Sequence, residues 1–296
     1  MTVEVEGRRL RLRNLDKVLY PATGTTKGEI LHYYARVAPV LLPHLAGRAV
    51  TRIRWPDGTD SEKFFEKNMP AGAPGWVRCV GVPTRADGGG DTISYPVIDG
   101  LASLTYFANL AALELHVHQW KVDADDRLLN PDRLVIDLDP GAPAGLHECA
   151  QVALLVRERL ADMGLASAPV TSGSKGLHLY AALPGRLDAE EVRDLARQVA
   201  RDLTRAHPDL VLWQMTKSMR GGKVFVDWSQ NTRTKTTISP YSLRGTGRPY
   251  AAAPRTWEEV EEGAASPGTL RHLEMGEVLR RVSETGDVFA ALLHPA

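Results

Sequence analysis

The sequence predicts an α+β fold, with helices layered on a mixed β-sheet, and three observations support this prediction. Segments from residue 134 to residue 227 alternate in the order strand, helix, strand, strand, helix, strand. The run LVIDLDPG is apolar and stops at Pro140 and Gly141, which is typical of a buried strand. The segments CAQVALLVRERLADMG and AEEVRDLARQVARDLTRAH carry apolar residues at helical spacing and therefore predict two helices.

Local signals predict the other elements in order along the chain. Apolar side chains recur at helical spacing in ILHYYARVAPVLLPHL, and Thr26 followed by Glu29 is a capping-box pattern at the start of that helix. Residues 70–74 and 85–91 contain prolines or glycines and predict loops. SLTYFANLAALELHVH predicts a helix that runs into a strand or turn. APVTSGSKGLHLYAAL predicts two strands joined by a Ser/Gly loop, and GKVFVDWSQ predicts another strand.

Length and composition indicate an ordinary globular protein. The 296 residues suit one large domain or two closely packed ones, and 43% hydrophobic residues are ample for a core. No apolar run is long enough for a membrane span, and the N-terminus lacks a secretory pattern. Cys79 and Cys149 predict neither a disulfide framework nor a zinc site, and they fit a reducing cytoplasm.

The charges balance overall but are unevenly distributed. With 36 basic and 36 acidic residues, the net charge of zero weighs against a general nucleic-acid-binding surface. Between Lys217 and Arg248, however, Asp227 is the only acidic residue, whereas four glutamates gather between Glu258 and Glu262. The basic block could contact phosphate groups or could be a solvated charged surface. Its basic residues are Lys217, Arg220, Lys223, Arg233, Lys235, Arg244 and Arg248.

Three aspartates form a candidate metal site. Alternate residues of a strand share a face, so Asp137 and Asp139 should point the same way. Neighbouring carboxylates repel unless a cation neutralises them, and their oxygens suit Mg²⁺ or Mn²⁺. Asp227 ends the apolar run VFVD, and if the two strands are adjacent, three carboxylates meet as in two-metal catalysis. The alternative is that these strand-end aspartates cap turns.

The segment TSGSKGLH is a candidate anion-binding loop. Its successive backbone N–H groups, with Ser172, Ser174 and Lys175, could hold a phosphate, and His178 at the start of the next strand could reach it. The segment does not have the Walker pattern. The alternative is that this segment is an ordinary Ser/Gly turn that binds no ligand.

Histidines and aromatic residues supply two further candidates. In ELHVH the alternating histidines lack a third ligand for zinc at close spacing, so His116 is a catalytic or phosphate-contacting candidate. We expect His118 to be a structural histidine. In EKFFEKN, Phe64 or Phe65 could stack on a base beside the lysines, and we expect one of the two to fill the core.

Four motifs in order resemble one family. LVIDLDPG, PVTSGSKGLHLY, MTKSMRGGKVFVDWSQN and TISPYSLRG are together similar to the polymerase domain of bacterial ligase D, in the archaeo-eukaryotic primase superfamily. The resemblance covers about residues 14–254 and continues more weakly beyond. It implies a primase-type α+β fold, with mixed central sheets and an RRM-like catalytic layer flanked by helices. It also implies one catalytic domain over residues 1–296, with a DNA-end subregion to about 110, a metal and nucleotide core to about 255, and an acidic helical tail.

The resemblance implies a template-directed nucleotidyltransferase of the DNA polymerase or primase type. Such an enzyme extends a primer 3′-hydroxyl at DNA gaps or breaks with NTPs or dNTPs, using two Mn²⁺ or Mg²⁺ ions. Its role would be end joining or gap filling near the nucleoid, with Ku and a separate DNA ligase as partners. The KxDG motif of a ligase is absent, so we expect a stand-alone polymerase or one domain of a longer protein. The residues alone leave open a metal-dependent nuclease or a non-catalytic DNA-end-binding module.

The resemblance also assigns individual residues. The implied metal ligands are Asp137, Asp139 and Asp227, with His116 as the active-site histidine. The implied nucleotide-binding residues are Phe64, Ser172, Lys175, Gly176, His178, Lys217, Gln230 and Arg244. The implied pocket for a DNA 5′-phosphate is Asn14, Lys17 and Lys27. Two departures stand out: Ile53 replaces a basic residue, and glycines 88–90 occupy an expected primer- or synapsis-contacting loop, where Arg85 is the nearest candidate.

Overall fold

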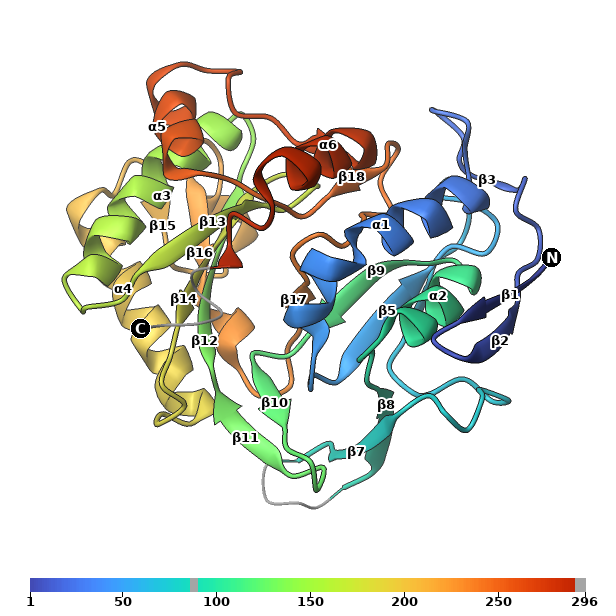
Figure 1. Ribbon diagram of the computed structural model, residues 1–296. Helices are drawn as coiled ribbons and strands as arrows, with labels where there is room; N and C mark the ends of the chain where they lie inside the picture. Colours follow the sequence, from blue (N-terminus) through green and yellow to red (C-terminus); the bar gives the residue numbers. More distant parts are fainter. Residues whose placement is uncertain (86–89, 291–296) are drawn as a thin grey trace. The chain divides into compact units, whose positions relative to one another are not determined.

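The computed structural model describes residues 1–85 and 90–290, and it divides the chain into two compact units (Figure 1). The first unit comprises Met1–Leu128, Thr236–Ala252 and Leu273–Gly286. The second comprises Leu129–Lys235, Ala253–His272 and Asp287–Ala296. Each unit has its own β-sheet with helices packed on it, which confirms the predicted α+β class.

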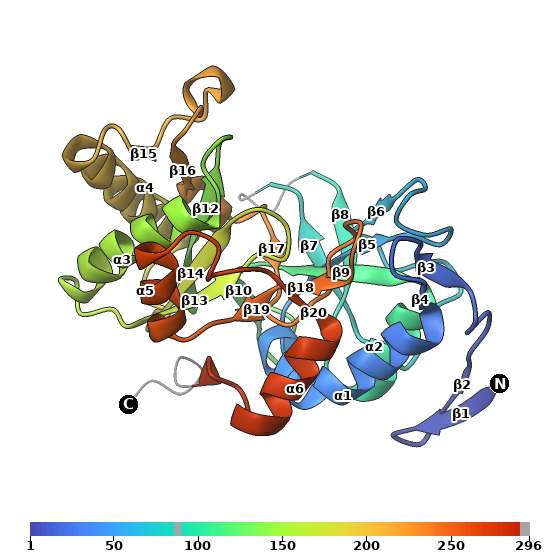
Figure 2. The ribbon, with the colours of Figure 1, turned by 90° about the horizontal axis from the view of Figure 1, so that it is seen from above.

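The first unit is built on a four-stranded antiparallel sheet in the order β17, β9, β5, β6. Helices α1 (Lys27–Leu45) and α2 (Leu101–Asn109) pack against each other on one face of this sheet, as Figure 2 shows. Helix α6 (Met275–Thr285) contacts α1. The strands are β5 (Val50–Arg54), β6 (Phe64–Glu66), β9 (Ala112–Val117) and β17 (Thr237–Ile238).

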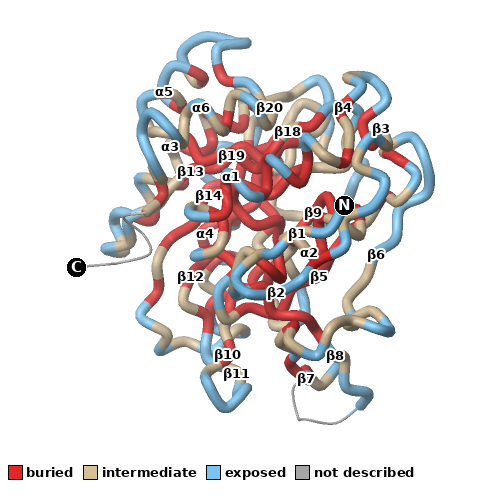
Figure 3. Tube along the Cα trace, turned by 45° about the vertical axis from the view of Figure 1, so that its right-hand side comes forward, coloured by how far each residue is buried: buried red, intermediate tan, exposed pale blue. Residues whose placement is uncertain are grey.

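Short two-stranded sheets lie outside the two main sheets. Figure 3 shows that β5 and β9 are largely buried, whereas the hairpin of β1 and β2 is largely exposed. The pairs are β1 (Thr2–Val5) with β2 (Arg8–Arg11), β3 (Val18–Tyr20) with β4 (Thr25–Thr26), β7 (Cys79–Pro83) with β8 (Thr92–Pro96), β10 (Trp120–Val122) with β11 (Leu128–Pro131), and β18 (Tyr250–Ala251) with β20 (Leu273–Glu274).

The second unit is built on a six-stranded mixed sheet in which β12 (Arg133–Pro140) is central. All neighbouring strands are antiparallel except β15 and β16, which are parallel. Two 3₁₀ turns, η1 (Lys217–Met219) and η2 (Trp228–Asn231), flank β16. The order is β15 (Val211–Leu212), β16 (Val224–Asp227), β12, β14 (Leu177–Ala182), β13 (Ser167–Thr171) and β19 (Ala253–Pro254).

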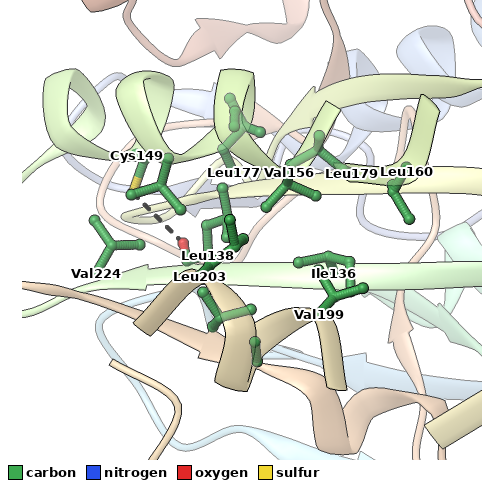
Figure 4. Packing of buried hydrophobic residues seen from close by; sticks show 14 of the residues in the cluster. Ile136, Leu138, Cys149, Val156, Leu160, Leu177, Leu179, Val199, Leu203 and Val224 are labelled. Atoms are coloured by element: carbon green, nitrogen blue, oxygen red, sulfur yellow. Dashed lines mark hydrogen bonds between the residues drawn. The ribbon is translucent and has the colours of Figure 1, made fainter. Parts of the chain in front are cut away.

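The core of the second unit positions the functional face of β12. Helices α3 (Leu146–Ala161), α4 (Ala189–Ala206) and α5 (Trp257–Ala265) contribute apolar residues to one cluster with the sheet. Ile136 and Leu138 of β12 point into this cluster beside α3 and α4 residues such as Val156 and Leu203 (Figure 4). Because side chains alternate along a strand, the residues between them point to the opposite face. Asp137 is one of these.

Most predicted elements are confirmed. Residues 30–45 lie in α1, and Thr26 and Glu29 form the expected capping box. LVIDLDPG lies largely in β12, and the two amphipathic segments form most of α3 and α4. The predicted loop at residues 85–91 falls partly on residues 86–89, outside the described residues. Within residues 1–85 and 90–290, no helix is both long enough and apolar enough to span a membrane.

Candidate active site

Three carboxylates converge on two adjacent inner strands of the second unit's sheet. Asp137 and Asp139 lie two residues apart on β12, and Asp227 is the last residue of β16. The two strands pair antiparallel with Asp137 opposite Asp227, and one ligand atom from each aspartate lies within 4.8 Å of the others. The predicted convergence of these carboxylates is therefore confirmed.

The electrostatics of this cluster fit a divalent cation. Burial and the neighbouring Asp137 carboxylate raise the pKa of Asp139 to about 6, although His178 opposes the shift. Asp137 and Asp227 are both buried, and concentrated negative charge is costly away from water. Clustered carboxylate oxygens are the ligands that Mg²⁺ and Mn²⁺ prefer. The three aspartates could therefore hold a divalent metal.

Residues after β16 orient the carboxylates. Gln230 Nε2 donates to Asp227 Oδ2 at 3.1 Å and to Asp137 Oδ2 at 3.3 Å. The backbone N–H of Ser229 donates to Asp227 Oδ1 at 2.9 Å, and its hydroxyl donates to the same oxygen. Lys235 Nζ donates to the Ser229 hydroxyl and lies 3.9 Å from Asp227 Oδ2. The resemblance implies that Gln230 binds the nucleotide, and in the structure its amide contacts the carboxylates.

The Ser/Gly loop joins β13 to β14 beside the same cluster. The Ser172 hydroxyl accepts hydrogen bonds from the backbone N–H groups of Ser174 at 3.2 Å and Gly176 at 3.1 Å. A Cβ atom on Gly176 would lie 1.9 Å from the Leu138 carbonyl oxygen, so only glycine permits this approach to β12. The Lys175 side chain is on the exposed part of the loop.

His178 lies next to the carboxylates, and Lys217 lies on the 3₁₀ turn that precedes β16. His178 is opposite Asp137 in the β12–β14 register, and its Nε2 atom lies 3.2 Å from Asp137 Oδ1. Lys217 begins η1 and is exposed. The second unit thus places a loop lysine and a histidine beside a cluster of carboxylates, which is an arrangement able to bind a polyphosphate together with its metal ions.

In the first unit, a buried glutamate holds two predicted site residues. Glu114 Oε2 accepts from His116 Nε2 at 2.7 Å and from Arg244 Nη1 at 3.1 Å, and Oε1 accepts from the Gly245 N–H at 3.0 Å. Burial by itself would raise the pKa of Glu114, but His116, Arg244 and the Gly245 N–H together lower it to about 2. Glu114 is therefore a buried anion that holds the side chains of both His116 and Arg244.

The sequence reasoning missed Glu114, Ser229 and Lys235 as members of these clusters. The alternation of Glu114 and His116 on one strand was a usable signal, because alternate residues share a face. Ser229 lies two residues after Asp227, a spacing at which a carboxylate often caps a turn. Lys235 carried no distinguishing local signal.

The aromatic pair on β6 corrects one expectation. Phe64 is 43% exposed and Phe65 is 59% exposed, so neither fills the core. The reason is that β6 is a short edge strand, whose residues have a neighbouring strand on one side only. His118, by contrast, is buried and stacks on Trp120 with ring centroids 4.3 Å apart, as expected of a structural histidine.

The arginines flanking Ile53 anchor that edge strand. Ile53 itself is buried. Arg54 Nη1 lies 2.6 Å from Glu66 Oε1, and the fully buried Arg52 lies 3.6 Å from the same carboxylate and donates to the Asn68 carbonyl oxygen. These contacts hold β6 against β5, so the two arginines serve the packing of the strand that presents Phe64.

The residues predicted to bind a 5′-phosphate lie together at the start of α1. The Lys27 N–H donates to the Lys17 carbonyl at 2.8 Å, and the Lys17 N–H donates to the Asn14 carbonyl at 3.2 Å. Lys27 Nζ donates to the Arg13 carbonyl at 2.7 Å. Burial, followed by the charges of Lys17 and Arg13, lowers the pKa of Lys27. Positive side chains at a helix N-terminus favour an anion.

Lys17 also has an acidic neighbour. Its Nζ atom lies 2.6 Å from Asp57 Oδ1, and both side chains are partly exposed. An anion binding to Lys17 would therefore compete with Asp57 for the ammonium group.

Comparisons with known proteins all give the same family. The family model described as LigD, primase-polymerase domain, matches residues 26–289. The multifunctional non-homologous end joining protein LigD of Mycobacterium bovis is 50% identical over 290 residues, covering 96% of this chain and 37% of that protein. The bifunctional LigD of Bacillus subtilis is 35% identical over 254 residues, covering 86% of this chain and 40% of that protein.

A solved structure is similar over nearly its whole length. The polymerase domain from Mycobacterium tuberculosis Ligase D in complex with DNA superposes with a TM-score of 0.91 at 49% identity. The match covers 97% of this chain and 99% of that chain. The present chain therefore spans less than half the length of these two curated relatives but nearly all of that polymerase domain.

Proposed function

Because the chain belongs to the LigD primase-polymerase family, we propose that it is a template-directed nucleotidyltransferase that extends a primer 3′-hydroxyl at DNA gaps or breaks with NTPs or dNTPs. Its fold is of the archaeo-eukaryotic primase type. The observation that carries the proposal is the convergence of three aspartates beside the Ser/Gly loop in the second unit. The proposal takes residues 1–296 as one catalytic domain, as the resemblance implies.

The aspartates would supply the metal site. Asp137, Asp139 and Asp227 would hold two Mn²⁺ or Mg²⁺ ions, which when bound lower the pKa of the attacking hydroxyl and stabilise the leaving pyrophosphate. The protein's own part is to keep the carboxylates oriented. Gln230 and Ser229 do this by donating hydrogen bonds to carboxylate oxygens, which leaves the remaining lone pairs available for ligation.

Other residues would hold the incoming nucleotide. Lys175 and His178 would donate to the triphosphate, joined by Lys217, because phosphate oxygens accept strong hydrogen bonds from cationic donors. In the first unit, Glu114 would keep in fixed orientations the side chains of His116, the implied active-site histidine, and Arg244, an implied nucleotide-binding residue. Phe64 would stack on the base, since its ring is exposed on β6.

The DNA substrate would be a gap or break with a downstream 5′-phosphate. Asn14, Lys17 and Lys27 would bind that phosphate at the start of α1. Repair by non-homologous end joining is named for the similar LigD proteins, and we extend it to this chain as part of the proposal. Ku and a DNA ligase are proposed partners in the same process.

Primer extension tests this proposal directly. The substrate is a gapped duplex with a downstream 5′-phosphate, supplied with NTPs or dNTPs and with Mn²⁺ or Mg²⁺. We expect the wild-type protein to extend the primer and release pyrophosphate, and we expect Asp137→Ala and Asp227→Ala to lose extension. The control is Asp162→Ala, because Asp162 is an exposed aspartate of the same unit outside the cluster.

The same assay separates the competing functions. A metal-dependent nuclease would release nucleoside monophosphates from the substrate rather than pyrophosphate. A non-catalytic DNA-end-binding module would bind the gapped duplex without extending it. Extension by Asp137→Ala at the wild-type rate would contradict the proposed role of the aspartates.

A further inference from the structure

The N-terminal hairpin carries an exposed basic ridge, which we define as Arg9, Arg11 and Arg13. Arg9 and Arg11 are alternate residues of β2 and therefore share one face, while Leu10 between them is buried. Arg13 is also exposed. Among the described residues, none of these three guanidinium groups lies within ion-pair distance of a carboxylate, although Glu4 is opposite Arg9 in the hairpin register.

The backbone beneath the ridge is held in place by the first unit. The Glu6 carboxylate accepts hydrogen bonds from two backbone N–H groups at the start of α2, at 2.9 and 3.2 Å. The Asn109 side chain, at the other end of α2, donates to the Arg11 carbonyl at 3.1 Å and accepts from the Arg13 N–H at 3.3 Å. Figures 1 and 2 show the hairpin at the α2 end of the unit. The arginines therefore project from a fixed backbone.

The ridge is continuous with the pocket proposed for the 5′-phosphate. Arg13 directly precedes Asn14, and its carbonyl accepts from Lys27 Nζ at 2.7 Å. Arg13 lies four positions after Arg9, and four steps of extended chain span at most about 14 Å. One strand of B-DNA rises about 3.4 Å per nucleotide, so the ridge is long enough to follow about four nucleotides.

We propose that Arg9, Arg11 and Arg13 bind the sugar–phosphate backbone of the downstream DNA strand, starting next to its 5′-phosphate. This inference rests on the proposed function, because it takes Asn14, Lys17 and Lys27 as the site of that phosphate. Exposed guanidinium groups without acidic partners are suited to phosphate oxygens, which they bind through charge-assisted hydrogen bonds. Such contacts carry no base specificity, and they position the duplex beyond the gap.

The test measures how affinity depends on the length of the downstream duplex. Fluorescence anisotropy is recorded for gapped duplexes with about 3 or about 12 downstream base pairs, each with and without the 5′-phosphate, over a range of salt concentrations. The variant is the triple substitution Arg9→Gln, Arg11→Gln and Arg13→Gln. The matched control is Arg8→Gln, because Arg8 is an exposed arginine of the same strand whose guanidinium lies over Trp76.

The expected result is a loss confined to the long duplex. The wild-type protein should bind the long duplex more tightly than the short one, and the triple variant should lose about tenfold or more of its affinity for the long duplex. The slope of log affinity against log salt concentration should fall by about 2 to 3, which corresponds to about 0.9 per lost phosphate contact. Arg8→Gln should behave as the wild-type protein does. Circular dichroism spectra of the variants should match the wild-type spectrum, which checks that they are folded.

Two outcomes would overturn the inference. The triple variant could keep the wild-type salt slope and affinity on the long duplex, or Arg8→Gln could lose as much as the triple variant does. A failure of the proposed 5′-phosphate pocket gives a different result. The wild-type protein would then bind phosphorylated and unphosphorylated duplexes with equal affinity. The difference in affinity between long and short duplexes would still be measured on both substrates.

Discussion

Replacing Glu114 by glutamine should destabilise the protein by about 3 kcal/mol at neutral pH. Glu114 is buried, and its contacts with His116, Arg244 and the Gly245 N–H outweigh the effect of burial and lower its pKa from 4.5 to about 2. A difference of about 2.5 between the unfolded and folded pKa values corresponds to about 3 kcal/mol of folding free energy. Glutamine has nearly the same shape but lacks the charge, so the substitution removes this contribution.

The sign of the pH dependence follows from the lowered pKa. A carboxylate with a depressed folded-state pKa contributes its full stability above about pH 4.5, and the contribution is lost as the pH falls towards about 2. The stability difference between the wild-type protein and Glu114→Gln should therefore shrink from about 3 kcal/mol at neutral pH to about 2 kcal/mol near pH 3.5. Urea unfolding of both proteins at each pH measures this difference.

The control for this prediction is Glu62→Gln, because Glu62 is an exposed glutamate of the same unit. That substitution should change the unfolding free energy by less than about 0.5 kcal/mol. If Glu114→Gln is as stable as the wild-type protein at neutral pH, or if its destabilisation does not shrink on acidification, the ionised carboxylate does not stabilise the fold as we infer. Primer extension by Glu114→Gln should also fall by about 10- to 100-fold, because His116 and Arg244 lose their common anchor.

Three further predictions follow from the sites described. Because the pKa of Asp139 is raised, the metal-free protein should lose stability as the pH rises from about 4 to about 6. Thermal melts should show this loss in the wild-type protein, but not in Asp139→Asn or with Mn²⁺ added. Gly176→Ala should cost about 3 kcal/mol in urea unfolding, because the new Cβ would meet the Leu138 carbonyl oxygen; wild-type stability would contradict that contact. Asp57→Asn should tighten binding of a 5′-phosphorylated gap a few-fold in anisotropy titrations by freeing Lys17, and unchanged affinity would show that the two do not compete.

Part of the fold was predictable because its signals are local. The apolar spacing of α1 and its capping box lie within about twenty consecutive residues, and periodicity identified them directly. The alternation in β12 likewise predicted that Asp137 and Asp139 share a face. Short strands such as β15, with two residues, have too few positions to show a period and were not predicted.

The composition of each site depended on pairings between distant residues. Asp227 meets Asp137 only because β16 pairs with β12 in one particular register, and these residues are 90 positions apart in the sequence. The contact between Glu114 and Arg244 spans 130 positions. The expectation that one of Phe64 and Phe65 fills the core was wrong, because burial depends on whether a neighbouring strand covers the residue.

The sequence by itself determined the chemical types at the site and its family. Strand alternation and ligand chemistry are local properties, so they indicated the aspartates and the Ser/Gly loop. The four motifs in order then indicated the family by resemblance. Only the tertiary structure decided that Gln230 contacts carboxylates, that Glu114 anchors His116, and that an arginine ridge adjoins the pocket at Lys27. The physical reason is that hydrogen bonds and charges act over a few ångströms in space, and strand pairing and helix packing determine which distant residues come that close.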